Sequence, residues 1–401
     1  MRVLLVNAVC GKGSTGRICT DIYDMLKQHG HEAEVAYAHG EATRINISDT
    51  FRINDVKGYY IHNLLARISD RAGFYSKKAT KRFIRFIDEY KPDIIHLHNL
   101  HGFYINIRIL FDYLSQSNIK VVWTLHDCWA FTGHCAHYSF AKCNKWLTEC
   151  NNCTLKHDYP QSFFIDHSRR NYRDKCKLFT SLPQLTLTTP SEWLAGEVRK
   201  SYLKKYPVFP IYNGIDLDSF QPVESSVRQM LKIEPDKKML LAVAYDWSER
   251  KGLDDLLRLN QVMDKRIYQL VIVGLSKKQI ECLPDDIIKL PRTESLDDLV
   301  KLYSAADIFV NTSYEETMGM VTAEALACGT PAIVYDQTAV PEVIDSNSGI
   351  VVRAGDISGI LTALSNVKSI DKKACRVRAQ TFEKNRQYGK YYQLYLNVLG
   401  K

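Results

Sequence analysis

The sequence predicts an α/β protein with two doubly wound domains. Short apolar runs typical of buried parallel strands alternate with helical patterns along the 401 residues. The series begins with a strand over residues 2–7 followed by a glycine loop, and it restarts with a strand over residues 239–244. A complete strand–helix–strand unit also lies between residues 306 and 335. Because a chain of this length can form two domains of ordinary size, we expect one parallel sheet in each half.

Composition and charge are those of a soluble globular protein. The sequence is 45% hydrophobic and 24% charged, and no apolar run approaches the roughly 20 residues that a membrane-spanning helix needs. The N-terminal residues form a predicted strand and show no signal-peptide cleavage pattern, so we expect a cytoplasmic protein. The formal net charge of +8 would suit nucleic acid, acidic lipid or a phosphorylated substrate.

The first strand leads into a glycine-rich segment at residues 10–17. It contains a Gly-x-Gly-x-x-Gly pattern, and a helix is expected from about Arg17 to Gly30. A dinucleotide site would also need an acid at the end of the second strand, where the sequence has His39-Gly40 instead, so a nicotinamide or flavin is disfavoured. The backbone N–H groups of the loop would still suit a phosphate or a substrate oxygen.

A basic amphipathic segment follows a region, residues 41–75, that is expected to hold a loop and a helix near 59–69. Five cations fall at helical spacing among apolar side chains: Lys77, Lys78, Lys81, Arg82 and Arg85. Such a helix could dock on an anionic membrane surface, or it could be the solvated face of an ordinary packed helix. The sequence leaves both readings open.

Two further strands, over residues 92–98 and 121–125, bring histidines to one edge of the predicted sheet. The first ends in His98, and the second is followed by His126 and Asp127. Carboxyl ends of neighbouring parallel strands meet at the same edge, where ligands bind. A single histidine is more often a satisfied core residue, but the paired strand-end positions favour a functional role for His126.

A cysteine-rich insertion occupies residues 128–160. Its four clustered cysteines follow Cys-x7-Cys-x6-Cys-x2-Cys, and the last pair has zinc-knuckle spacing. Four thiolates would complete a structural zinc site, whereas the alternative is a set of reduced, partly buried thiols. A nucleic-acid-binding zinc finger is not expected, because the histidine spacing and a following recognition helix are missing. The candidate ligands are Cys135, Cys143, Cys150 and Cys153.

The second half repeats the strand–helix alternation after an Asn-Gly-Ile-Asp turn at residues 213–216. A loop ending in Lys251-Gly252 follows the strand over 239–244, and a tyrosine-rich helix ends the chain. We predict an N-terminal domain over residues 1–206, a C-terminal domain over residues 207–383, and a final helix over residues 384–401 that packs back towards the first domain.

Three acids mark the strand–helix–strand unit between residues 306 and 335. Glu315 and Glu316 lie in the loop after its first strand, and Glu324 lies inside a helix of mostly small and apolar residues over about 319–328. An acid in such a helix needs a partner. It could be a structural ion pair, or it could be a sugar or ribose, because a carboxylate accepts from two neighbouring hydroxyls.

This unit resembles the Glu-x7-Glu signature of retaining nucleotide-sugar glycosyltransferases of family four, which have the GT-B fold. Glu316 and Glu324 keep the spacing. Asp-x-x-His-x-His at 93–98, Thr-x-His-Asp at 124–127 and the turn at 213–216 also look like family motifs, so the resemblance covers nearly the whole chain apart from the cysteine insertion. The matching positions around the two acids are Ser313, Gly319, Ala325, Gly329 and Pro331.

The sequence departs from the family pattern at two places. Thr317-Met318-Gly319 stands where Gly-Phe-Gly is usual, which bears on the shape of the donor loop. Asp246 stands where an arginine is expected before Lys251-Gly252. Arg250 would then reach inward in its place, or the phosphates would have one cation fewer.

The resemblance implies two Rossmann-like domains facing a central cleft and transfer of a hexose, with retention, from a nucleoside-diphosphate sugar, first of all a UDP-sugar. The acceptor would be a glycan or a polyprenyl-linked glycan of a bacterial exopolysaccharide, capsule or O-antigen pathway, which would bring peripheral contact with the inner face of the plasma membrane. No nucleic acid and no catalytic cofactor are implied. The alternatives are a GT-B nucleotide-sugar epimerase and a non-enzymatic sugar-nucleotide-binding protein.

The resemblance also implies roles for individual residues. His126 would lie beside the transferred sugar, Glu316 would bind the donor sugar, and Lys251 would bind the diphosphate. Donor binding would further involve Glu324 at the ribose, Arg250, Gly319, Met320, Arg292 and Thr293. The acceptor and phosphate side would comprise Gly13, Ser14, Thr15, Gly16, Arg17, His98 and Asp127.

Overall fold

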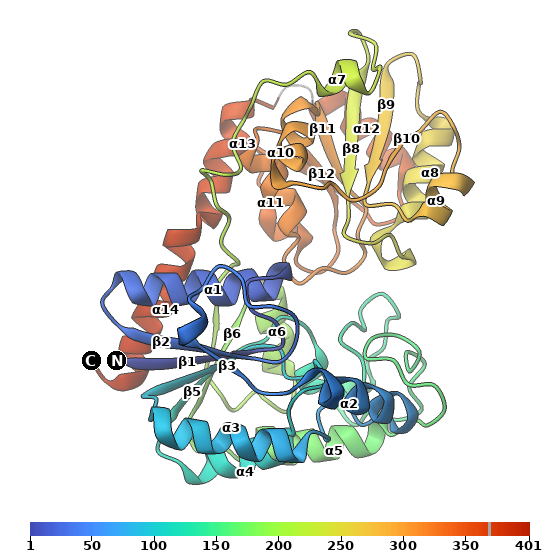
Figure 1. Cartoon of the computed structure of the whole chain (residues 1–401). Coiled ribbons are helices and arrows are strands. Elements are labelled where there is room, and N and C mark those ends of the chain that lie inside the picture. Colours follow the sequence, from blue (N-terminus) through green and yellow to red (C-terminus); the bar gives the residue numbers. More distant parts are fainter. Residues whose placement is uncertain (368–369) are drawn as a thin grey trace. The chain divides into compact units, whose positions relative to one another are not determined.

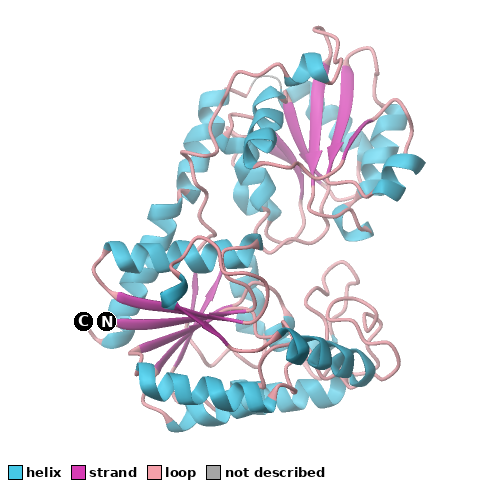
Figure 2. Cartoon of the chain, in the orientation of Figure 1, coloured by secondary structure: helices cyan, strands magenta, loops and turns pink. Residues whose placement is uncertain are grey.

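The computed structural model describes residues 1–367 and 370–401 and divides the chain into two compact units. Unit 1 comprises Met1–Tyr212 and Gln387–Lys401, and unit 2 comprises Asn213–Arg386 (Figure 1). Each unit has a parallel sheet with helices on both faces (Figure 2). The predicted α/β class with two Rossmann-like sheets is therefore observed.

The sheet of unit 1 has seven parallel strands in the order β3-β2-β1-β4-β5-β6-β7. They are β1 (Arg2–Asn7), β2 (Glu32–Tyr37), β3 (Thr50–Arg52), β4 (Ile94–Leu97), β5 (Lys120–Thr124), β6 (Leu185–Thr189) and β7 (Val208–Pro210). The helices are α1 (Gly13–Gln28), α2 (Val56–Ser69), α3 (Lys77–Tyr90), α4 (Ile107–Gln116), α5 (Ser168–Phe179), α6 (Glu192–Lys200) and, from Gln387 onwards, α14 (Lys384–Leu399).

Strand β1 shows why this sheet needs helices on both faces. Its alternate side chains point to opposite sides, and all five from Val3 to Asn7 are buried. Val3 and Leu5 belong to a core formed with α1 and α14, whereas Leu4 and Val6 belong to a core formed with α3, α4 and α5. Figure 1 shows α1 and α3 on opposite faces of the sheet. A continuous apolar strand is thus explained by burial on both sides.

The sheet of unit 2 has six parallel strands in the order β10-β9-β8-β11-β12-β13. They are β8 (Lys238–Val243), β9 (Tyr268–Val273), β10 (Ile288–Leu290), β11 (Ile308–Asn311), β12 (Ala332–Tyr335) and β13 (Gly349–Val352). The helices are α7 (Val227–Met230), α8 (Leu253–Val262), α9 (Lys277–Cys282), α10 (Leu296–Ala305), α11 (Met320–Ala327), α12 (Ile357–Asn366) and α13 (Lys372–Ala379).

The strand order of each sheet reverses at one place, which defines where a ligand would bind. In unit 1 the reversal lies between β1 and β4, and in unit 2 it lies between β8 and β11. Ligands of doubly wound sheets bind beyond the carboxyl ends of the strands at this point. In unit 2 these ends lead into the loops at residues 244–252 and 312–319.

One element boundary differs from the prediction at the glycine segment. Helix α1 begins at Gly13, four residues before the expected start at Arg17, so residues 13–16 are the first turn of the helix and not a loop. The backbone turns earlier, at Gly11, whose φ is +70° and whose N–H donates to Gly16 O at 3.1 Å. Three glycines in seven residues masked the helix start, because glycine has low helix propensity.

The short edge strand β3 is not predicted by the sequence, because it lies within residues 41–75, where the pattern indicates a loop and a helix near 59–69. Within the described ranges, 1–367 and 370–401, no helix combines the length and the apolar character required to cross a bilayer.

Candidate active site

Lys251 and Glu316 form an ion pair at the carboxyl edge of the unit 2 sheet. Lys251 ends a short 3-10 turn after β8, and Glu316 lies in the loop after β11, so the pair spans the strands at which the sheet order reverses. Lys251 Nζ contacts Glu316 Oε1, to which Ser313 Oγ also donates at 3.2 Å. The two side chains are 16% and 17% exposed, so solvent or a ligand can reach them.

The backbone around this pair is fixed by contacts between the two loops. Gly252 has a φ of +72°, and a Cβ there would overlap the carbonyl oxygen of Thr312. Thr312 Oγ1 in turn donates to Lys251 O at 3.1 Å and to Gly252 O at 3.0 Å. Only glycine fits this position, because it needs both the left-handed conformation and the missing side chain.

Arg250 turns towards the loop after β11. Its Nη1 donates to Glu315 O at 2.9 Å, and its own carbonyl accepts from the N–H of Tyr314 at 2.9 Å. Asp246, which stands where the family pattern has arginine, is exposed. The loops therefore hold two cations, Arg250 and Lys251, near the buried Glu315 and the partly buried Glu316.

Glu324 is 7% exposed and lies on α11. The hydroxyl of Tyr303 on α10 donates to Glu324 Oε2 at 3.0 Å. Burial raises the pKa of Tyr303 well above its ordinary value, and the charge of Glu324 adds to that shift. A neutral tyrosine is thus one partner of the acid, and this partner could not be found from sequence because it comes from another helix.

The start of α11 lies between the two acids of the motif. Gly319 precedes the helix with a φ of +88°, and Met320 is its first residue. No side chain caps this end, so its first N–H groups have no side-chain acceptor from the capping residue.

Arg292 and Thr293 follow β10, as predicted, and the structure shows what Arg292 contacts. Its Nε donates to Tyr245 O at 2.7 Å, and its guanidinium lies 3.5 Å from the centre of the Tyr245 ring. Tyr245 follows β8 and is 73% exposed. Sequence reasoning missed this ring, although its place directly after a strand could have marked it.

In unit 1, His98 and His126 lie together beyond β4 and β5. His98 Nδ1 and His126 Nε2 are 2.9 Å apart, and their rings stack with centroids 5.2 Å apart. Among the described residues, His98 Nε2 has no hydrogen-bond partner. Burial lowers the pKa of His126 to about 4, although Asp127 partly offsets it, and burial lowers the pKa of His98 further. Both rings are therefore neutral near pH 7.

Asp127 is engaged by a third histidine that the prediction left without a role. His101 Nε2 lies 2.8 Å from Asp127 Oδ2, and the hydroxyl of Tyr159 lies 2.9 Å from His101 Nδ1. Burial opposes ionisation of Asp127, but His101, His137 and the N–H of Trp129 together outweigh it, and the pKa of Asp127 falls to about 2. The carboxylate therefore orients His101, and His98, His126 and Asp127 border one small cavity.

The predicted phosphate segment forms the N-terminus of α1. Gly13, Ser14 and Arg17 are exposed there, Thr15 is partly buried and Gly16 is buried. No side chain caps this end and its first turn carries no acid. An uncapped helix N-terminus presents N–H groups and a positive dipole end, which suits an anion.

The four predicted zinc ligands, Cys135, Cys143, Cys150 and Cys153, line one small cavity. Thiol contacts link Cys135 to Cys153, and Gly133 N–H donates to Cys150 Sγ at 3.1 Å. Across residues 1–367 and 370–401, however, no three His, Cys, Asp or Glu side chains are arranged as a metal-binding set. The zinc site stays a prediction.

Comparisons with known proteins agree with the fold and the motifs. The family model "Glycosyltransferase Family 4" matches residues 15–219, and the model "Glycosyl transferases group 1" matches residues 237–368. The chain is 22% identical over 372 residues to the putative colanic acid biosynthesis glycosyl transferase WcaC of Escherichia coli K12, covering 89% of this chain and 88% of that protein.

Solved structures resemble the whole chain. Sucrose-phosphate synthase from Thermosynechococcus elongatus aligns with a TM-score of 0.72 and 17% identity, covering 100% of this chain and 99% of that one. HepE of Anabaena in complex with UDP-glucose aligns with a TM-score of 0.67 and 14% identity, covering 98% and 99%. At these identities the likeness shows the fold, and the predicted GT-B class is confirmed. Since the family 4 model alone spans more than half of its length, the chain belongs to the family 4 glycosyltransferases.

Proposed function

We propose that the protein transfers a hexose from a UDP-sugar to a hydroxyl of a glycan or polyprenyl-linked glycan, with retention at the anomeric carbon. The observation that carries this proposal is the Lys251–Glu316 ion pair, which joins the loops after β8 and β11, where the strand order of the unit 2 sheet reverses. It sets a fixed cation and a carboxylate where a sugar diphosphate would need both. HepE, which shares the fold, is seen with UDP-glucose, which supports the choice of donor.

The residues of unit 2 have separate tasks in this proposal. Lys251 and Arg250 bind the diphosphate, because a fixed cation stabilises the negative charge that develops on the leaving group. Glu316 accepts hydroxyls of the donor sugar, and Glu324, held by Tyr303, accepts the ribose hydroxyls. The N-terminus of α11 at Gly319 and Met320 adds N–H groups.

The N-terminal unit supplies groups for the sugar and the acceptor. In this reaction His126 lies beside the transferred sugar, and His98 fixes the orientation of the His126 ring through their hydrogen bond. A neutral imidazole can donate to one hydroxyl and accept from another. The N-terminus of α1, from Gly13 to Arg17, serves an anionic group of a substrate.

The reaction needs no group beyond donor and acceptor. The bond between the anomeric carbon and the phosphate oxygen breaks, and the acceptor oxygen forms its bond to the same face of that carbon. The acceptor proton passes to the departing phosphate oxygen. Fixed cations and N–H dipoles can stabilise this charge without a cofactor.

The pathway proposed is assembly of a bacterial surface polysaccharide. WcaC is named for colanic acid biosynthesis, and a second relative, 22% identical over 317 residues, is encoded in the cps region of Klebsiella pneumoniae. Both names support a glycan acceptor. A cytoplasmic site with peripheral contact to the inner face of the plasma membrane would suit such an acceptor.

Nucleotide release tests the proposal. Purified protein is incubated with UDP-, GDP- and ADP-sugars, with and without lipid-linked acceptors, and the anomeric configuration of any product is read by NMR. We expect release from a UDP-sugar that depends on acceptor and a product with retained configuration. Conversion of the donor without acceptor would indicate an epimerase, and no release with any donor would mean that the protein only binds sugar nucleotides.

We also propose that the four thiols of the cysteine insertion hold a structural zinc. They share one cavity, and four thiolates bound to one zinc ion would cross-link the segment there. Metal analysis of protein purified without chelator should find about one zinc per chain, a stoichiometry that follows from a four-thiolate site. The double substitution Cys150→Ser/Cys153→Ser should remove it. A zinc content near zero in the unsubstituted protein would contradict the site.

A further inference from the structure

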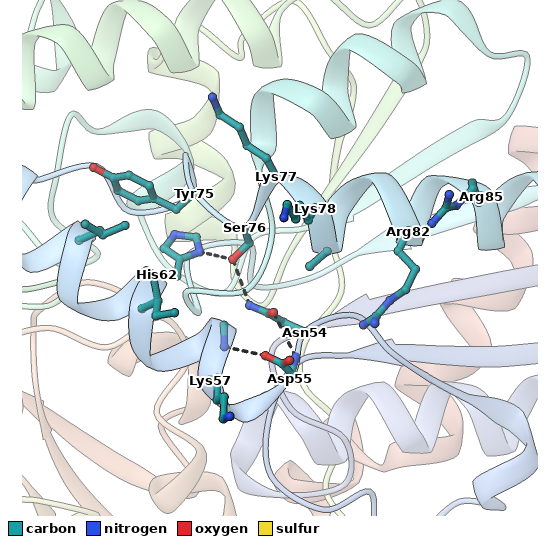
Figure 3. Close-up of a pocket in the computed structure, with 14 residues that line it drawn as sticks. Asn54, Asp55, Lys57, His62, Tyr75, Ser76, Lys77, Lys78, Arg82 and Arg85 are labelled. Carbon is teal, nitrogen blue, oxygen red and sulfur yellow. Dashed lines mark hydrogen bonds between the residues drawn. The ribbon is translucent and has the colours of Figure 1, made fainter.

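Unit 1 contains a cavity of about 610 Å³ between α2 and α3, and none of its lining residues belongs to the candidate active site. Five of its lining side chains are cations, one from α2 and four from α3 (Figure 3). Asp55 is the single acid among the described lining residues, and its carboxylate already caps α2 by accepting from Gly58 N–H at 2.6 Å. The cations are Lys57, Lys77, Lys78, Arg82 and Arg85.

The charge of this cavity is not neutralised by the protein. Within the described part of the chain, no carboxylate forms an ion pair with any of the five cations. Arg82 Nη2 donates to the backbone oxygens of Arg52 and Ile53, which carry no formal charge. An excess of positive charge in a concave site attracts anions.

The floor of the cavity is a fixed polar network centred on Ser76. Asn54 Nδ2 donates to Ser76 Oγ at 3.0 Å, and His62 Nδ1 lies 2.8 Å from the same oxygen (Figure 3). His62 Nε2 accepts from Gly73 N–H at 3.3 Å, so a neutral His62 carries its proton on Nδ1 and donates it to Ser76. Ser76 Oγ then accepts twice, which leaves its own proton to donate to an oxygen in the cavity.

Beside the cavity, α2 exposes an apolar face. Tyr60, Leu64 and Ile68, spaced four residues apart, are 65%, 57% and 41% exposed. Ile61 and Leu65 continue this face into the cavity lining. A contiguous exposed apolar face of this kind marks an interaction site.

The apolar face extends beyond α2 through a loop that is tied to its end. The N–H of Phe163 donates to Arg67 O at 2.7 Å, and the Arg67 guanidinium lies 5.5 Å from the Phe163 ring. The next residue, Phe164, is 73% exposed. An aromatic ring held at the surface by backbone contacts suits the boundary between water and lipid.

We propose that the α2–α3 cavity and the adjoining apolar face of α2 dock the protein on an anionic membrane. The cavity takes the phosphate of a lipid headgroup, with its cations and Ser76 as donors, and the apolar face enters the lipid interface. A soluble phosphate or a nucleic acid would use the cations but would leave the apolar face in water, so the combination favours lipid. The proposal does not depend on the donor or the reaction.

Sedimentation with lipid vesicles tests the charged half of the surface. The full-length protein should bind vesicles of phosphatidylcholine containing about one-third phosphatidylglycerol and should not bind pure phosphatidylcholine. Lys78→Glu/Arg85→Glu should weaken binding at least ~30-fold, since each cation near such a surface contributes roughly a kilocalorie and reversal adds repulsion. The control Lys177→Glu/Lys204→Glu changes the same charge at exposed positions on unit 1 outside the cavity and should leave binding unchanged.

A second pair of variants separates lipid from other anions. Tyr60→Ser/Leu64→Ser should weaken vesicle binding about ten-fold but leave binding to heparin unchanged, because only lipid buries these side chains. The control Met230→Ser/Val262→Ser removes equally exposed apolar side chains from unit 2 and should have no effect. The membrane proposal would be overturned if neither double substitution weakened vesicle binding. It would also be overturned if only Lys78→Glu/Arg85→Glu weakened it.

Discussion

The two units place very different pairs of side chains at the carboxyl edges of their sheets. In unit 2, Lys251 and Glu316 follow the neighbouring strands β8 and β11, and the pair is charged and partly exposed. In unit 1, His98 and His126 follow the neighbouring strands β4 and β5, and the pair is buried and neutral. The same parallel-sheet edge thus supports two kinds of chemistry.

The difference shows how burial decides what a sheet edge can bind. The two side chains of a partly exposed ion pair keep their charges. They can replace part of their contact with each other by contacts with a phosphate or a sugar. Two stacked imidazoles that are buried lose their charge and can only exchange hydrogen bonds, which suits hydroxyl groups. In the proposed reaction, the Lys251–Glu316 pair would therefore serve the anionic part of the donor, and the His98–His126 pair would serve neutral hydroxyls.

We expect the largest effect from removal of the fixed cation, Lys251. We expect Lys251→Ala to lower kcat for nucleotide release about 10²–10³-fold, because a preorganised charge at a departing diphosphate contributes roughly 3–4 kcal/mol to transition-state stabilisation. Steady-state kinetics with the active UDP-sugar measures this loss.

Lys265→Ala provides the matched control for Lys251→Ala. Lys265 forms an ion pair with Asp286 in the same unit, but half of its side chain is exposed. An exposed pair contributes little, so the variant should keep its activity. If Lys251→Ala retained more than about a third of the wild-type kcat, less than one kilocalorie per mole, the diphosphate role of Lys251 would be wrong.

The next prediction concerns the backbone that holds the cation. We expect Gly252→Ala to lower the free energy of unfolding of unit 2 by about 3 kcal/mol and to lower activity, because a Cβ overlaps Thr312 O and φ is +72°. Gly196→Ala is the control: it lies in α6 with no atom near the added Cβ, so it should be neutral or stabilising by up to ~1 kcal/mol. Urea unfolding followed by circular dichroism compares the two. Equal stability of both variants would mean that the loop adapts to a side chain.

Much of this architecture could be predicted from sequence because it follows from local patterns. Strands β1, β5 and β8 fall, to within one residue, where the apolar runs at residues 2–7, 121–125 and 239–244 predicted them. Ser191, the residue directly before α6, caps that helix by accepting from Leu194 N–H at 3.2 Å, and serine is a preferred residue at this position. Signals of this kind need only neighbouring residues, so the sequence contains them in full.

Other features depend on contacts between distant residues, which a single sequence does not record. Tyr303 meets Glu324 across two helices, and His101 meets Asp127 across two loops. The cavity between α2 and α3 likewise arises where two helices meet, although the basic residues of α3 were visible as a pattern. Patterns identified the site-bearing loops but could not identify the partners that orient their side chains.

The pH dependence of stability tests whether His126 is neutral in the folded protein. An unfolded histidine titrates near 6.5, whereas folded His126 titrates near 4, so between these values the unfolded chain binds more protons. The contribution of His126 is fully present above pH 6.5 and is lost as the pH falls towards 4, by about 2 kcal/mol at pH 5. Urea unfolding at pH 7 and pH 5 should show this loss in the wild type and a smaller one in His126→Gln.

His157→Gln serves as the control for the pH experiment, because His157 is exposed. This variant should keep the wild-type difference in unfolding free energy between pH 7 and pH 5. If His126→Gln kept the full difference as well, His126 would be charged or accessible in the folded protein, and the distinction drawn between the two sheet edges would fail.

The smallest expected effect tests whether Tyr303 acts by positioning Glu324. Tyr303→Phe removes one hydrogen bond to a carboxylate, and we expect KM for the UDP-sugar to rise about five-fold, roughly 1 kcal/mol, with kcat nearly unchanged. Tyr268→Phe is the control, because it removes the hydroxyl of another buried tyrosine of unit 2, which donates to the backbone oxygen of Leu364. A merely structural role would lower the stability of both variants and leave KM alone. A fall in kcat with unchanged KM would instead place the Tyr303–Glu324 pair at the reacting centre, because an interaction made only in the transition state affects kcat.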